Sequence, residues 1–108
     1  MKSLIFGMLF LFLTGAAVAG ELYGTIIEAG KPIPAGTKIE VTVSGKIFAG
    51  ETDKYGAYRI FAAEKGKGVL TAFYKNQKLA ADIFSYERAT RYDWTVEVVE
   101  GKMTLKRR

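Results

Sequence analysis

The sequence predicts an all-β protein, an antiparallel β-sandwich of about seven strands that follows an N-terminal signal peptide. Turn-forming residues recur about every eight to twelve residues, a spacing typical of short strands in a sandwich or barrel. Residues 37–43 and 91–99 alternate apolar and polar side chains, and no segment shows the longer period of an amphipathic helix. Because 49% of the chain is hydrophobic, two sheets packed face to face bury these side chains better than one sheet.

Residues 1–19 have the pattern of a secretory signal peptide. Lys2 provides the positive charge, residues 4–13 form an apolar run, and Ala17-Val18-Ala19 predicts cleavage after Ala19. The run is shorter than the ~20 apolar residues that span a bilayer, although an uncleaved N-terminal anchor stays open as the alternative. We therefore expect one mature domain over residues 20–108, without a transmembrane span, in the periplasm or secreted.

Composition narrows the classes of partner and of chemistry. The chain has no cysteine, so it holds neither a disulfide nor an acceptor for a bacterial lipid anchor, which favours a bacterial exported protein. Without Lys2 it has 15 basic and 11 acidic residues, a net charge of +4. Export argues against nucleic acid as the partner, which leaves lipid headgroups, glycans or proteins of the cell envelope. Nothing in the pattern selects an oligomeric state.

The first half of the mature chain predicts four strands. They are expected at residues 21–28, 37–43, 46–52 and 57–62, with a loop at 29–36 and a turn at Ser44-Gly45. Gly24, inside the first strand, indicates a bulge or a close approach of another backbone segment. In the second strand Ile39, Val41 and Val43 share one face, which we expect to be buried.

Thr52-Asp53-Lys54-Tyr55-Gly56 predicts a sharp turn between the third and fourth strands. The Asp53 carboxylate can accept hydrogen bonds from amides two or three residues later, and Gly56 can adopt a positive φ. We therefore interpret both residues as structural, with Tyr58 and Ile60 of the next strand anchored in the core.

The second half predicts three or four further strands. They are expected at residues 69–74, 79–84, 91–99 and 103–105, joined by a loop at 64–68, polar turns at 75–78 and 100–102, and a connection at 85–89 that has room for one helical turn. In the long strand Tyr92, Trp94, Val96 and Val98 share one face, which favours packing in the core.

The order of these motifs resembles the carboxypeptidase regulatory-like domain family. The similarity runs through Gly24-Thr25-Ile26, residues 30–41 and residues 51–58, and covers about residues 22–75. It implies a transthyretin (prealbumin)-like Greek-key sandwich, grouped with carbohydrate-binding-like folds. Such domains are usually non-catalytic and occur beside enzymes, in outer-membrane receptors and as exported single-domain proteins, so the fold alone does not fix a function.

The residues give little support to catalysis, and we predict no catalytic, cofactor or metal site. Without histidine and cysteine, the Ser-His and Cys-His nucleophile systems are absent. The transthyretin-related hydrolases of 5-hydroxyisourate need histidines and a different C-terminal sequence, which makes a hydrolase the least favoured function. Asp53 lacks the acidic neighbours that a calcium loop requires.

Four residues are the candidate ligand contacts. Tyr55 and Tyr86 lie in expected loops, where binding residues concentrate. Arg88 and Arg91 begin a basic concentration that continues at Lys102, Lys106, Arg107 and Arg108. The leading hypothesis is an exported, non-enzymatic module with a binding or structural role in the bacterial envelope. The alternative is a carbohydrate- or peptidoglycan-binding domain.

Overall fold

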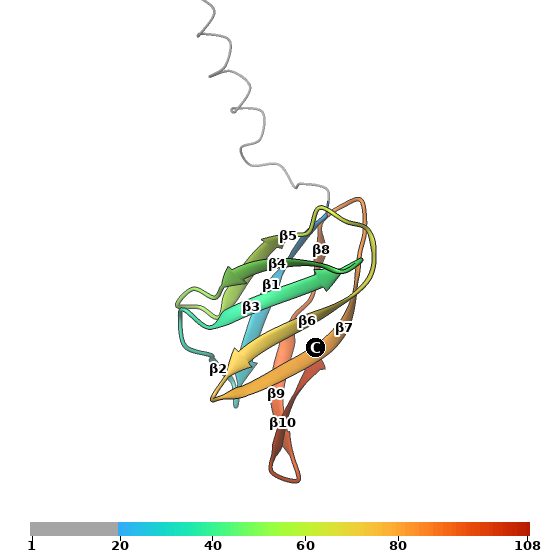
Figure 1. Ribbon diagram of the computed structural model, residues 1–108. Coiled ribbons are helices and arrows are strands. Elements are labelled where there is room, and N and C mark those ends of the chain that lie inside the picture. The colour runs from blue at the N-terminus through green and yellow to red at the C-terminus, as the bar shows by residue number, and fades with distance from the viewer. Residues whose placement is uncertain (1–19) are drawn as a thin grey trace, which may run out of the picture.

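The computed structural model describes residues 20–108, and the predicted signal peptide and its cleavage site after Ala19 lie outside the described residues. Every regular element in the described part of the chain is a strand (Figure 1). The strands are β1 (Glu21–Glu28), β2 (Lys31–Pro32), β3 (Lys38–Val43), β4 (Lys46–Glu51), β5 (Ala57–Phe61), β6 (Gly66–Tyr74), β7 (Gln77–Ser85), β8 (Thr90–Arg91), β9 (Trp94–Val99) and β10 (Lys102–Arg107).

The strands form two sheets that pack as a sandwich, which confirms the predicted fold class. The smaller sheet has the order β4-β3-β6-β7, and its pairs are all antiparallel. The larger sheet has the order β10-β9-β1-β2, with β5 and β8 also paired to β1. Because β1 runs parallel to β8 and β9, the sandwich is not wholly antiparallel. Ten strands are present instead of about seven, partly because β2 and β8 are two-residue strands.

The predicted strand at residues 91–99 is interrupted, yet its register is continuous. Leu22 pairs with Thr90 and Ile26 with Trp94, the same offset along both strands. Between these pairs Asp93 Oδ1 accepts the main-chain N–H of Thr25 at 2.8 Å. A side-chain carboxylate thus takes the place of a main-chain acceptor, which explains why β8 and β9 are separate strands.

Four tight hairpin turns connect consecutive antiparallel strands. Both central residues of each turn have positive φ, as in the type I′ turns that suit the twist of a hairpin. These turns are Ala29-Gly30, Ser44-Gly45, Lys75-Asn76 and Glu100-Gly101. The predicted turns after β3, β6 and β9 are therefore confirmed.

The structure corrects several details of the sequence interpretation. The loop at 29–36 contains the short edge strand β2, and β6 begins at Gly66, inside the loop expected at 64–68. The connection after Ser85 contains no helical turn. Val98 is 60% exposed, because the β9–β10 hairpin extends beyond the smaller sheet and leaves its tip without a facing layer (Figure 1).

The close approach of the Tyr92 main chain to β1 explains why residue 24 is glycine. A Cβ at Gly24 would lie 1.9 Å from the Tyr92 carbonyl oxygen, so the close approach expected at this glycine is confirmed. The same carbonyl accepts the buried Tyr58 hydroxyl at 2.6 Å, and that hydroxyl accepts Trp94 Nε1–H at 3.1 Å. Burial raises the pKa of Tyr58 far above its usual range.

The core lies between the two sheets. Ile39, Val41 and Val43 of β3 are fully buried in it, as their alternation predicts.

The turn before β5 is held by one carboxylate. Asp53 Oδ1 accepts the main-chain N–H groups of Tyr55 at 2.8 Å and Ala57 at 3.0 Å. Gly56 has φ +74°, and a Cβ there would lie 2.5 Å from the carbonyl oxygen of Ile26. Asp53 and Gly56 thus act on backbone geometry, and Tyr55 projects from the turn into solvent.

Candidate ligand-binding surface

The connection between β7 and β8 carries the candidate site, and Tyr92 fixes where it starts. The Tyr92 hydroxyl accepts the main-chain N–H of Phe84 at 3.0 Å and donates to the Phe84 carbonyl at 3.2 Å. Tyr92 is buried and stacks on Trp94, with ring centroids 5.8 Å apart. These hydrogen bonds hold the end of β7 against the larger sheet, and they fix the main-chain position from which the connection with Tyr86 begins.

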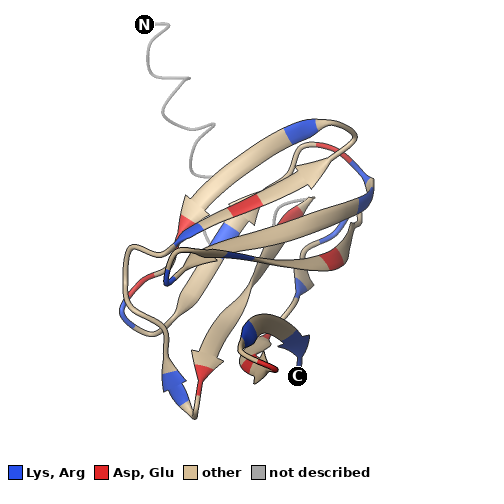
Figure 2. Ribbon diagram, turned by 60° about the horizontal axis from the view of Figure 1, so that its bottom comes forward, with Lys and Arg blue, Asp and Glu red and all other residues tan. Residues whose placement is uncertain are grey.

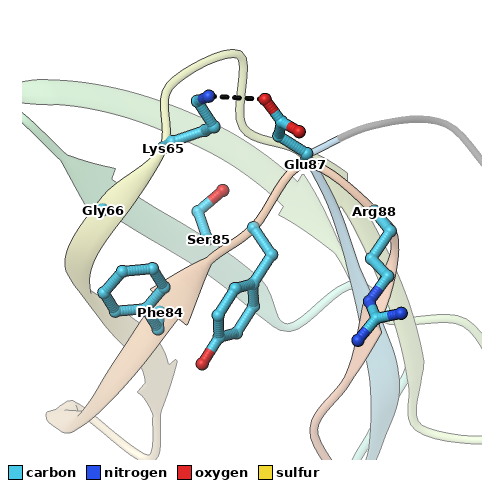
Figure 3. Close-up of a pocket in the computed structure, with 7 residues that line it drawn as sticks. Lys65, Gly66, Phe84, Ser85, Glu87 and Arg88 are labelled. Atoms are coloured by element: carbon cyan, nitrogen blue, oxygen red, sulfur yellow. Dashed lines mark hydrogen bonds and ion pairs between the residues drawn. The ribbon is translucent and has the colours of Figure 1, made fainter.

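A depression beside the end of β7 is called here the aromatic hollow. It has a volume of about 640 Å³ and is lined by Lys65, Gly66 and residues 84–88. The Phe84 and Tyr86 rings form one wall, with centroids 4.5 Å apart. Figure 3 shows the Lys65–Glu87 ion pair, 2.6 Å long, at one side of the hollow, and Arg88 opposite Lys65 and Phe84.

A second, smaller hollow adjoins the first across Tyr86. It has a volume of about 250 Å³ and is lined by Gly20, Phe61 to Lys65, Tyr86 and Glu87. Phe61, Phe84 and Tyr86 are each at least 37% exposed, although all three are large aromatic side chains. Grouped exposed aromatic side chains often mark an interaction surface.

The third depression, called here the arginine hollow, lies on the other side of Tyr86. It has a volume of about 440 Å³ and is lined by Tyr86, Arg88, Ala89, Thr90, Arg91, Tyr92 and Arg107. Three arginine residues thus line one hollow, and no aspartate or glutamate is among its lining residues. The structure brings three of the four candidate contacts, Tyr86, Arg88 and Arg91, to one place, although they come from a connection and a short strand.

Two of the three arginines are held in place by neighbours. Arg91 Nε donates to Asp93 Oδ2 at 2.9 Å. Arg107 donates from Nη2 to the Arg91 carbonyl at 3.2 Å and lies over the Tyr92 ring, 4.3 Å from its centroid. The Arg88 side chain, in contrast, makes no hydrogen bond or ion pair with any residue in 20–108.

Asp93 is the carboxylate that pairs with Arg91. Partial burial alone would raise the pKa of Asp93, but hydrogen bonds from the Thr25 amide and from Arg91 outweigh it and lower the pKa. Asp93 therefore stays ionised at neutral pH and holds Arg91 without lining the arginine hollow.

The remaining predicted contacts lie elsewhere. Tyr55 is 64% exposed in the turn before β5 and lines neither the aromatic nor the arginine hollow.

The basic residues near the C-terminus do not all lie at one place on the surface. Arg107 joins the arginine hollow and Arg108 donates to Thr25, whereas Lys102 begins β10 next to the hairpin turn. Figure 2 shows basic residues, in blue, at the C-terminal end of the chain.

Sequence reasoning missed Phe61, Phe84 and Arg107 as members of the surface. Phe61 was predictable as outward-facing, because it alternates with the buried Tyr58 and Ile60 along β5. Its proximity to Tyr86 depends on the packing of the two sheets, which the local pattern does not encode.

Within residues 20–108 no cluster of three or more His, Cys, Asp or Glu side chains could hold a metal ion. Residues 20–108 contain no helix that is long and apolar enough to cross a membrane.

No protein-family model matches the chain, and no curated protein matches it. Among solved structures, one similar chain is described as a "Ca2+-stabilized adhesin" that "helps an Antarctic bacterium reach out and bind ice". It is 13% identical, with a TM-score of 0.36 over 79% of this chain. The match spans only 28% of the adhesin chain. A likeness at this level supports no conclusion about ligand or function.

Proposed function

We propose that the protein is an exported, non-enzymatic binding module of the bacterial envelope, and that its ligand binds around Tyr86. The observation that carries this proposal is the meeting of three hollows at one half-exposed tyrosine. Tyr86 and Phe84 supply apolar area with few rotatable bonds, which gives binding energy at a low cost in conformational entropy.

The chemistry of the hollows supports binding rather than catalysis. The chain has no histidine or cysteine to act as a nucleophile or as a base near neutral pH. Glu87, a carboxylate of the aromatic hollow, has its pKa lowered by the hydrogen bond from Lys65. An ionised, paired carboxylate is a poor proton donor at neutral pH, so Glu87 is poorly suited to act as a general acid.

Export and family membership are part of the same proposal. Export is supported by the positive, apolar and small-residue order of residues 1–19. Membership of the carboxypeptidase regulatory-like family, with its Greek-key topology, is supported by the order of the Gly24, Pro32 and Asp53 motifs and by their places in a β-sandwich.

A carbohydrate is the second candidate ligand, and Ser85 favours it. The Ser85 hydroxyl is fully buried, lines the aromatic hollow and has no hydrogen-bond partner within residues 20–108. An unsatisfied buried hydroxyl costs free energy that a hydrogen-bonding ligand or a water can recover. A sugar offers hydroxyl groups for Ser85 and an apolar face for the neighbouring rings of Phe84 and Tyr86.

Co-sedimentation of the purified protein with two isolated fractions, peptidoglycan sacculi and envelope membranes, tests the proposal. We expect the wild type to bind one fraction and Tyr86→Ala to weaken that binding at least about tenfold, as a buried aromatic anchor does. Tyr55→Ala is the matched control, because it removes an exposed tyrosine outside the hollows. Equal binding by both variants, or no binding by the wild type, would refute the proposal.

Ser85→Ala separates the second candidate from the first. If the ligand is a carbohydrate, Ser85→Ala should weaken binding to sacculi while leaving the thermal stability of the free protein unchanged or higher. Unchanged binding to sacculi by Ser85→Ala would reject a sugar hydroxyl at this position.

A further inference from the structure

We propose that the arginine hollow is an oxyanion site, which binds a phosphate or carboxylate group of the ligand that contacts Tyr86. This inference deepens the proposed function and rests on it for the ligand's location, because Tyr86 lines both the aromatic and the arginine hollows. The two hollows would then receive two parts of one molecule, an apolar part and an acidic part.

The concentration of charge is the first observation. Three of the chain's five arginines, Arg88, Arg91 and Arg107, line a single hollow of about 440 Å³ without a carboxylate in its lining. Asp93 neutralises Arg91 from outside the lining, whereas Arg88 and Arg107 form no ion pair within residues 20–108. A bound anion would therefore meet two positive charges that no carboxylate compensates.

The unused hydrogen-bond donors are the second observation. Each guanidinium has five N–H donors in a planar fork that matches the oxygens of phosphate and carboxylate. Arg88 uses none of them within residues 20–108, and Arg91 uses Nε for Asp93, which leaves its terminal amino groups. Arg107 uses Nη2 for the Arg91 carbonyl. Most donors therefore remain available to a ligand.

The third observation is that part of the site is already ordered. Asp93 holds Arg91, and the Tyr92 ring supports Arg107 from 4.3 Å. A ligand then has to order only Arg88, which lowers the entropy lost on binding. Lys102, next to the β9–β10 turn, differs from Arg91 and Arg107 because no carboxylate or aromatic ring holds its side chain within residues 20–108.

Arginine side-chain Nε–H signals in two-dimensional NMR spectra test the site directly. The probes are inorganic pyrophosphate for phosphate chemistry, oligogalacturonate for carboxylate chemistry and a neutral galactose oligomer as the control. We expect one anionic probe to shift the signals of Arg88, Arg91 and Arg107 more than those of Arg59 and Arg108, since Arg59 lies over the same Tyr23 ring as Arg91. The probe with the lower dissociation constant identifies the acidic group. Shifts of all five signals together, or of none, would overturn the proposal.

A charge-matched pair of variants separates a built site from general attraction. Arg88→Gln and Lys102→Gln each remove one positive charge, but only Arg88 lines the hollow. We expect Arg88→Gln to weaken binding of the anionic probe about tenfold, the scale of a hydrogen bond to a charged group. Lys102→Gln should change binding less than about twofold. Equal losses would mean that net charge alone attracts the probe, which would overturn the site.

Failure of the oxyanion site and failure of the proposed function give different results. If Tyr86→Ala loses envelope binding but Arg88→Gln does not, the binding module stands and the oxyanion site is wrong. If Arg88→Gln loses binding of the anionic probe while the wild type binds no envelope fraction, the oxyanion site stands and the envelope function is wrong.

Discussion

The hydroxyl of Tyr92 is hydrogen-bonded to both the N–H and the C=O of Phe84. One side chain from the segment between β8 and β9 thus occupies both main-chain groups of a residue near the end of β7. The contact joins the two sheets two residues before Tyr86, which lines all three hollows. The same hydrogen bonds therefore stabilise the sandwich and hold the main chain next to Tyr86.

Tyr92→Phe should therefore lower the stability of the fold. Removing the hydroxyl leaves the Phe84 N–H and C=O without their partner, and we expect the free energy of unfolding to fall by about 1–3 kcal/mol. Urea denaturation measures the change. Tyr55→Phe is the control, because its hydroxyl is exposed, and it should stay within about 0.5 kcal/mol of the wild type. Equal stabilities of the two variants would show that the Tyr92 contact adds nothing.

Gly24→Ala should be among the most damaging single substitutions. The added Cβ would lie 1.9 Å from the Tyr92 carbonyl oxygen, so β1 and the β8–β9 segment must move apart. We expect a loss of about 3 kcal/mol or more, the upper part of the range for overpacking. Gly45→Ala, in a turn with open space, should cost only about 1–2 kcal/mol for its positive φ. Thermal unfolding of both variants checks the order, and a milder effect at Gly24 would contradict it.

The lowered pKa of Asp93 predicts a loss of stability in acid. The folded state favours the ionised carboxylate, so the unfolded state binds more protons as the pH falls. The stabilisation is present above the unfolded pKa of about 3.9 and is lost as the pH falls through the lower, folded value. Asp93→Asn should be less stable than the wild type at pH 7, with a difference that shrinks below about pH 4. A difference independent of pH would argue against this role for the charge.

Tyr58 predicts the opposite dependence at alkaline pH. Burial raises its pKa in the folded state, whereas an unfolded tyrosine ionises near pH 10. The unfolded state loses its proton first as the pH rises, so stability should fall above about pH 10. Tyr58→Phe should flatten this fall, although it also loses the hydrogen bonds to Tyr92 and Trp94. Chemical denaturation between pH 8 and 11 compares the slopes, and parallel curves would exclude Tyr58 as the cause.

Binding at the arginine hollow should depend on salt. Charge attraction is screened over ~3 Å at 1 M salt, compared with ~10 Å at 0.1 M. We expect affinity for an anionic probe to fall strongly between these concentrations, measured by calorimetric titration. Affinity that does not change with salt would indicate a ligand held by the aromatic hollow alone.

The local sequence predicted most strands because alternation and turn chemistry are local properties. Ile39, Val41 and Val43 specified β3, and Asp53 and Gly56 marked the turn before β5. The interruption between β8 and β9 was not predictable in this way. It depends on the Asp93 carboxylate meeting the Thr25 amide, a contact between residues 68 positions apart.

The candidate surface was only partly predictable for the same physical reason. Tyr86, Arg88 and Arg91 lie close together in the sequence, so a loop interpretation could find them. Phe61 and Arg107 reach the same surface through the pairing of β5 with β1 and of β10 with β9. Tyr55 shared the loop character of Tyr86 but lines none of the three hollows around Tyr86, which no local pattern indicates.

Hydrogen–deuterium exchange in the presence and absence of the bound envelope fraction tests the central claim most directly. If the ligand binds around Tyr86, protection should appear at residues 84–92 and at the end of β10, while the turn at residues 53–56 exchanges as in the free protein. Protection confined to the Tyr55 turn or to the β9–β10 hairpin tip would contradict the account.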